Sequence, residues 1–153
     1  MIKIDLFFIK MQYLWLLDMK YQKKIHKAVA VDIWICLNKD QCLFNSNLWI
    51  VKKAIHFGAD FQADDNYAVV FAAENGHLEV VKYLIEIGAD FQAQNNYAIK
   101  SAAENGHLKV VKYLVEMGAD FQSQNNYAIR WAVRNGYFDV VKYLVELSIN
   151  NKN

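Results

Sequence analysis

The sequence predicts an all-α fold in which small two-helix units stack into a solenoid. Three observations lead to this prediction. A stretch of thirty residues occurs three times at a constant period. Each copy holds two segments whose apolar residues have helical spacing, and a glycine follows five of these six segments. Because a unit of this size cannot bury its apolar side alone, neighbouring units bury it, and the product is an extended array with a long binding surface.

The thirty-residue period defines the expected domain organisation. Its register is marked by Gly58-Ala59-Asp60, Gly88-Ala89-Asp90 and Gly118-Ala119-Asp120. The end of a solenoid needs a polar outer face to stay soluble, so an atypical capping segment is expected before the first unit. The chain divides into an N-terminal capping or accessory segment, a divergent repeat, three full repeats and a polar tail, at residues 1–30, 31–58, 59–88, 89–118, 119–148 and 149–153 respectively.

The second full repeat shows how each unit is expected to fold. Tyr97–Glu104 has apolar residues at helical spacing and predicts a first helix. Asn96 is the expected N-cap, because its side-chain oxygen accepts from a free amide of the first turn. Asn105-Gly106 ends this helix, since glycine adopts the left-handed conformation of a helix C-terminus at little cost. A second helix is predicted over His107–Met117, and Gly118 ends it.

These residues resemble the ankyrin repeat, whose pattern runs T-P-L-H-x-A-A, then x-x-G-H-x-x-V-V-x-L-L, and closes with G-A-D. The resemblance covers residues 59–148 closely and extends to residues 45–58, which align with the second helix of a repeat. It implies an ankyrin-repeat solenoid of helix-turn-helix units joined by finger loops. The matching stretches of the second repeat are Ala102-Ala103, Asn105-Gly106-His107-Leu108, Val110-Val111-Lys112-Tyr113-Leu114 and Gly118-Ala119-Asp120.

Two departures from the ankyrin pattern affect the loop before each first helix. The period is thirty residues rather than the usual 33, so the connecting finger loops are expected to be short. The T-P-L-H tetrad is absent, and Tyr97-Ala98-Ile99-Lys100 stands in its place in the second repeat. Asn66, Asn96 and Asn126 are therefore expected to cap the first helices. This short, asparagine-rich form resembles the ankyrin arrays of giant DNA viruses. The bias toward Lys, Asn and Ile fits an AT-rich genome, which protists also have.

Composition and charge narrow the classes of partner and compartment. The net charge of +1 argues against a protein that binds nucleic acid through its bulk charge. Cys36 and Cys42 lack the spacing of a zinc or redox motif and are expected to be buried free thiols. Charged residues interrupt the apolar N-terminus, so neither a signal peptide nor a membrane span is expected. The sequence predicts a soluble intracellular monomer, in the host cytoplasm if the source is a virus.

No pattern in the sequence indicates catalysis, a cofactor or a metal. No Ser/His/Asp order, P-loop or glycine-rich phosphate loop occurs. His77 and His107 open second helices at the position where the ankyrin pattern has histidine, and a packing role is expected for both. Tyr137 stands there in the third repeat, which a metal site would not tolerate. The sequence therefore predicts a protein that is not an enzyme.

The three repeats identify candidate binding residues by comparison with one another. Positions identical in all copies, such as Tyr67, Tyr97 and Tyr127, are interpreted as scaffold, and positions that change chemistry are free of the scaffold's demands. The alternative is that these changes are drift on a solvated face. The ankyrin resemblance implies that first helices and finger tips line a concave groove. Carried over by position, the groove residues are Asp64, Asp65, Phe71, Glu74, Asn75, Gln94, Asn95, Lys100, Ser101, Glu104, Asn105, Gln124, Asn125, Arg130, Trp131, Arg134 and Asn135.

We expect a non-catalytic interaction module that binds an unidentified protein partner through this groove. The resemblance to viral arrays implies a viral factor that engages a host protein. An alternative is a membrane-surface adaptor, in which residues 1–30 form a basic amphipathic anchor with Leu14, Leu17 and Tyr21 on its apolar side. A third interpretation is a duplicated, decayed array without a working partner.

Overall fold

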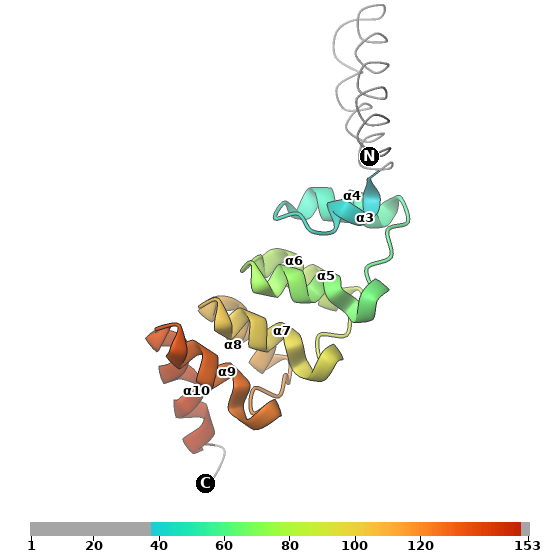
Figure 1. Cartoon of the computed structure of the whole chain (residues 1–153). Helices are drawn as coiled ribbons and strands as arrows, with labels where there is room; N and C mark the ends of the chain where they lie inside the picture. The colour runs from blue at the N-terminus through green and yellow to red at the C-terminus, as the bar shows by residue number, and fades with distance from the viewer. Residues whose placement is uncertain (1–37, 151–153) are drawn as a thin grey trace, which may run out of the picture.

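The protein is a stack of helix pairs (Figure 1), which confirms the predicted all-α repeat solenoid. The computed structural model describes residues 38–150, so the predicted segment 1–30, Cys36 and residues 151–153 lie outside the described residues. We call the first members of the pairs first helices and their partners second helices. The pairs are α3 (Lys39–Cys42) with α4 (Leu48–His56), α5 (Ala63–Glu74) with α6 (Leu78–Glu86), α7 (Ala93–Glu104) with α8 (Leu108–Glu116), and α9 (Ser123–Arg134) with α10 (Phe138–Asn150).

The glycines end the helices as the sequence predicts. The N–H of His107 donates to the carbonyl of Ala102 at 2.9 Å, and the N–H of Gly106 donates to the carbonyl of Ala103 at 3.2 Å. This pair of bonds is the Schellman motif, which needs a left-handed residue after the helix. Gly106 has a φ of +76°, and Gly118, with a φ of +93°, ends α8 in the same way.

The last second helix lacks this stop. In α10, Ser148 stands where the earlier copies have glycine. Its hydroxyl Oγ donates to the carbonyl of Leu144 at 2.8 Å, a bond that a serine makes within helical backbone. The helix therefore continues to Asn150, past the repeat boundary predicted at residue 148.

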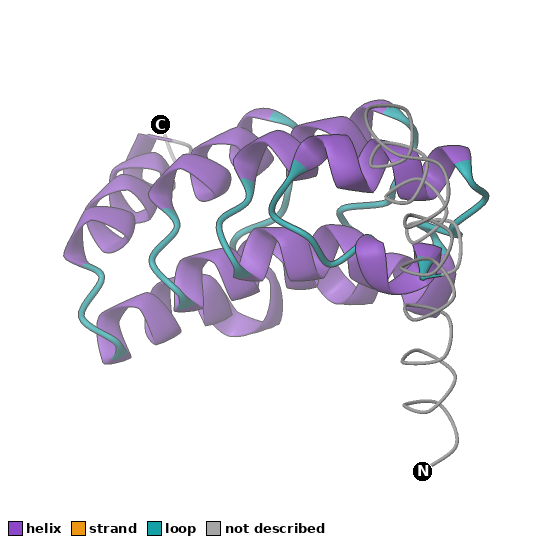
Figure 2. Ribbon diagram, turned by 90° about the horizontal axis from the view of Figure 1, so that it is seen from above, coloured by secondary structure: helices purple, strands orange, loops and turns teal. Residues whose placement is uncertain are grey.

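The core is a continuous layer between a row of first helices and a row of second helices (Figure 2). Alanines from the first helices and leucines from the second helices meet in this layer. Because alanine is small, the first helices approach one another closely, and they pack against their neighbours more tightly than the second helices do. The core positions repeated in all three copies are Ala72, Ala102, Ala132, Leu84, Leu114 and Leu144, each no more than 1% exposed.

Candidate partner-binding face

A turn of left-handed backbone lies near the start of α5, α7 and α9, before the right-handed part of each helix. In the second repeat, Gln94, Asn95 and Asn96 have φ values of 54°, 58° and 61°, and residues 64–66 and 124–126 have the same conformation. Left-handed backbone costs an L-residue roughly 1–2 kcal/mol, and Asn and Asp tolerate it best. The right-handed part of α7 therefore begins at Tyr97, as the sequence predicts, and the left-handed turn forms the short finger loop.

The asparagine that ends each turn holds the following repeat. Asn66 Oδ1 accepts a hydrogen bond from the N–H of Asp90 at 2.9 Å, and Asn96 Oδ1 accepts one from the N–H of Asp120 at 2.9 Å. The prediction that these asparagines cap the first helices is wrong. An N-cap residue has extended backbone, whereas Asn66 and Asn96 are left-handed, so their side chains bond to the next repeat instead. Asn126 ends the last turn, and none of the described residues bonds to its side chain.

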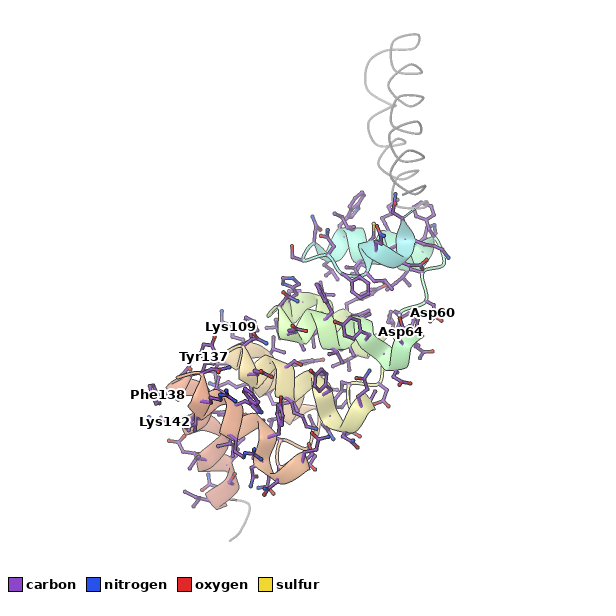
Figure 3. All side chains as sticks on the ribbon, viewed as in Figure 1. Asp60, Asp64, Lys109, Tyr137, Phe138 and Lys142 are labelled. Atoms are coloured by element: carbon purple, nitrogen blue, oxygen red, sulfur yellow. The ribbon has the colours of Figure 1, made fainter. Side chains whose placement is uncertain are left out.

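The tips of the left-handed turns form a continuous row. Gln94 Nε2 donates to the carbonyls of Asp64 and Asp65 at 3.3 and 3.4 Å, which joins the first turn to the second. Ser123 Oγ lies 2.9 Å from the carbonyl of Asp120, the nearer acceptor for its single proton, and 3.3 Å from the carbonyl of Asn95, so the third turn contacts the second. Figure 3 shows Asp64 at this edge of the stack. Six predicted site residues lie exposed at these tips: Asp64, Asp65, Gln94, Asn95, Gln124 and Asn125.

Aromatic side chains occupy the two ends of the first-helix row. Phe71 on α5 is half-buried and makes an edge-to-face contact with Phe44, with ring centroids 5.1 Å apart. Trp131 on α9 is also half-buried, and its ring centroid lies 5.6 Å from that of Tyr127. The guanidinium of Arg134 lies 4.5 Å from the Trp131 ring centroid. Both predicted aromatic residues are therefore partly accessible and are held by a neighbour.

Three accessible aromatic residues belong to this face although the repeat comparison did not select them. Phe44, Tyr67 and Tyr97 are 38–39% exposed. The period could have identified Phe44. It stands thirty residues before the predicted site residue Glu74, which lies half-buried at the end of α5, so the two occupy equivalent positions in successive repeats. Tyr67 and Tyr97, which the repeat comparison interprets as scaffold, are accessible as well. A residue can be identical in all three repeats whether it lies on the surface or in the core, so identity between repeats does not show that a position is buried.

Two predicted site residues lie inside the stack instead of on its surface. Lys100 is 1% exposed and Ser101 is 3% exposed, because the following repeat covers that side of α7. Lys100 Nζ has no hydrogen-bond partner and lies 5.9 Å from the centroid of the Tyr127 ring. Burial lowers the pKa of Lys100, and the charge of Asp120 offsets part of this effect. A partner does not reach these two side chains in this structure, whereas Arg130, the counterpart of Lys100, is exposed.

Other predicted site residues lie at the ends of the first helices, where several of their side chains also form hydrogen bonds to backbone carbonyls. The side-chain amides of Asn75 and Asn105 each donate at 2.9 Å to the carbonyl four residues before them. Asn135 Nδ2 donates to the carbonyl of Glu104 in the preceding repeat at 2.8 Å. Glu104 Oε2 accepts a hydrogen bond from the hydroxyl of Tyr127 at 3.3 Å. The bonds of Asn75 and Asn105 add a second donor to carbonyls that already accept from the backbone, whereas those of Asn135 and Tyr127 join the third repeat to the second.

A family comparison identifies this architecture. The family model described as Ankyrin repeats (3 copies) matches residues 40–125 and 98–153, which together make up most of the chain. The chain belongs to the ankyrin-repeat family. A comparison with curated proteins finds no match. Ankyrin repeats are in general modules of protein–protein interaction, and the family is typically non-catalytic.

This ankyrin array keeps the packing role of the family's histidine position. A Cβ atom on Gly76 would lie 2.5 Å from Nδ1 of His107, and one on Gly106 would lie 2.3 Å from Cδ1 of Tyr137. Each ring therefore packs directly on the glycine turn of the preceding ankyrin repeat. A left-handed turn precedes the position of the missing T-P-L-H tetrad, and the asparagine that ends the first turn bonds to the next repeat.

The rest of the described chain offers no metal centre and no membrane span. Within residues 38–150, no group of three or more His, Cys, Asp or Glu side chains could hold a metal ion. No helix in the same range is long and apolar enough to cross a bilayer. Cys42 is a buried free thiol, as predicted, and burial raises its pKa. The membrane-anchor alternative depends on residues 1–30, which lie outside the described residues.

Proposed function

We propose that this ankyrin array binds a partner protein across its first-helix face, which consists of the turn tips and the exposed side chains of α5, α7 and α9. The observation that carries this proposal is the row of tips, in which exposed polar side chains stand on left-handed backbone that hydrogen bonds fix between repeats. Strained backbone tends to persist at functional sites. A backbone that is already ordered loses little entropy when a partner binds, so the row supplies preorganised polar contacts.

The aromatic ends of the face supply the apolar anchors. Binding energy at protein interfaces concentrates in a few residues, among which Trp, Tyr and Arg are enriched. Trp131 is covered on one side by Arg134 and Tyr127 and remains partly accessible. At the other end, Phe71 and Phe44 form a second aromatic contact. A partner that spans both ends would engage two anchors separated by the polar tips of the middle repeat.

The charges of the face give the bound partner a direction. Asp64, Asp65 and Glu74 make the first-repeat end acidic, and Arg130 and Arg134 make the last-repeat end basic. Opposite charges attract and steer the encounter of two proteins. The partner therefore lies with its basic residues toward the first repeat and its acidic residues toward the third. The resemblance to giant-virus arrays supports a host protein as this partner and a viral factor as the role of the chain.

Affinity purification with the whole chain as bait tests the proposal and recovers the partner. We expect Trp131→Ser, which copies the second repeat, to weaken binding of the recovered partner by roughly 2 kcal/mol, or about thirtyfold in Kd. The thermal midpoint should stay near that of the parent chain. Trp49→Ser is the matched control, because Trp49 is 50% exposed on the second helix α4. Full binding by Trp131→Ser together with a lower midpoint would show that Trp131 only covers the end of the stack.

The direction of the partner gives a kinetic prediction. Changing Asp64 and Asp65 to Lys should slow association more than it speeds dissociation, because rim charges act mainly on the encounter. Stopped-flow or surface-binding kinetics at several salt concentrations measures this effect. Glu116→Lys with Glu146→Lys makes the same change in net charge on exposed second-helix positions and should have a smaller effect. An on-rate that responds neither to salt nor to the reversal at the tips would contradict the proposed direction.

A further inference from the structure

Three aromatic side chains form a cluster at the first-repeat end of the first-helix face. The ring of Phe44 makes edge-to-face contacts with Tyr67 and Phe71, with centroid separations of 5.8 and 5.1 Å, and the centroids of Tyr67 and Phe71 lie 6.4 Å apart. Phe44 and Tyr67 are 39% and 38% exposed, and Phe71 is half-buried. We call Phe44, Tyr67 and Phe71 the aromatic cluster. It presents to solvent apolar rings that are packed against one another.

The third repeat shows how a guanidinium lies at the equivalent position of a first helix. Trp131 stands at the position of Phe71, and Arg134 stands three residues later, at the position of Glu74. Side chains three residues apart lie on the same side of a helix. The guanidinium of Arg134 accordingly lies 4.5 Å from the centroid of the Trp131 ring. An aromatic ring at this position therefore has room for a guanidinium over it.

The first repeat keeps an aromatic ring at this position and replaces the cation by an anion. Glu74 lies three residues after Phe71 and is half-buried, and none of the described residues pairs with its carboxylate. No lysine or arginine among residues 38–150 lies over a ring of the aromatic cluster. Exposed rings attract a cation through their quadrupole, and a carboxylate on the same side of α5 attracts it through its charge.

The charge around the aromatic cluster also favours a cation. Residues 59–88 contain six acidic residues and a single lysine, Lys82. The amine of Lys82 is paired with Glu79 at 2.9 Å on the second helix α6, so it does not neutralise the first-helix face. Asp64 and Asp65 are exposed in the left-handed turn at the start of α5. Opposite charge steers a cationic group of a partner toward this end of the face.

We propose that the aromatic cluster and Glu74 form a subsite for an arginine side chain of the partner protein. The subsite belongs to the face proposed above to bind a partner, so it rests on that function and specifies the chemistry of one contact. Arginine lies over aromatic rings more often than lysine does, and its planar guanidinium matches a carboxylate through two parallel hydrogen bonds. Glu74 supplies the carboxylate, and Phe71 supplies a ring beside it. The partner's arginine takes the place that Arg134 occupies in the third repeat.

NMR titration of the full chain with the tripeptide N-acetyl-Gly-Arg-Gly-amide tests the subsite. We expect saturable shifts of the ring signals of Phe44, Tyr67 and Phe71, and weaker binding of the same tripeptide with lysine in place of arginine. A tripeptide with citrulline, which has nearly the shape of arginine without its charge, should leave these signals unchanged. Glu74→Gln should raise the Kd of the arginine tripeptide about fivefold, because it removes one partly accessible charge pair.

The third repeat supplies a variant that fills the subsite from within the chain. Glu74→Arg copies Arg134 and should place a guanidinium over Phe71. The ring signals of Phe71 should then shift before any peptide is added, and the arginine tripeptide should no longer bind. Glu86→Gln is the matched control, because it removes the same charge from an exposed position of the second helix α6. This control should leave the Kd of the tripeptide unchanged.

Several results would overturn the arginine subsite. The first is the absence of a ring shift at any soluble concentration of the arginine tripeptide. Equal binding of the citrulline or the lysine tripeptide would show that the cluster does not select a guanidinium. Equal losses in Glu74→Gln and Glu86→Gln would show a general attraction to an acidic repeat. Because the tripeptide stands in for the partner, each of these failures is distinct from a failure to recover a partner by affinity purification.

Discussion

Gly106→Ala is expected to lower the free energy of unfolding by roughly 2–5 kcal/mol, the largest effect of any change considered for this protein. Two costs add at this position. Gly106 has a φ of +76°, where an L-residue is strained. Its new Cβ would lie 2.3–2.7 Å from three atoms of the Tyr137 ring, which would have to move within the junction between two repeats.

Gly136→Ala is the matched comparison for this variant. Gly136 has a nearly identical φ of +79°, and its Cβ position is open, so only the backbone cost of roughly 1–2 kcal/mol applies. Urea unfolding of both variants measures the difference. Equal losses at the two glycines would show that the following repeat does not pack on Gly106.

Lys100→Met is expected to raise the free energy of unfolding by roughly 1–3 kcal/mol. Lys100 is 1% exposed, and its amine has no hydrogen-bond partner. Methionine has a similar length without the amine, and Val70 shows that an apolar side chain is accepted at this position, where it is 1% exposed. Arg130→Met is the matched control. Because Arg130 is exposed, its replacement should change stability by no more than about 0.5 kcal/mol.

The gain from Lys100→Met should depend on pH. Burial lowers the pKa of Lys100 in the folded chain, so between the folded and unfolded pKa values the unfolded chain binds more protons. The penalty of the buried charge is therefore complete below the folded pKa of Lys100 and declines as pH rises through that pKa toward the ordinary lysine value of 10.5. Unfolding of both chains at neutral and alkaline pH measures this decline. A variant less stable than the parent would show that Asp120 and the Tyr127 ring stabilise the amine.

Local sequence signals predicted the helices of this protein well. The first helix expected over Tyr97–Glu104 matches the right-handed part of α7, and the glycine at 106 has the left-handed backbone that was expected of it. These features depend on interactions within a few residues, namely apolar spacing and helix termination, and such interactions can be recognised in a single repeat. The tips and the aromatic residues Phe71 and Trp131 were selected by the ankyrin resemblance and by comparison of the repeats, and neither identifies a partner.

The sequence by itself determined the repeat period, the helices of the repeats and the glycines that end five of them, whereas α10 runs past its predicted end to Asn150. Only the tertiary structure decided which side of each helix the next repeat covers. Lys100 differs in chemistry from Val70 and Arg130, which marked it as a surface position, yet the third repeat buries it. Asn96 has the sequence of a helix cap, yet it bonds to Asp120 in the next repeat. Periodicity shows which residues share a face of one helix, whereas contacts between residues some thirty positions apart depend on how the repeats stack.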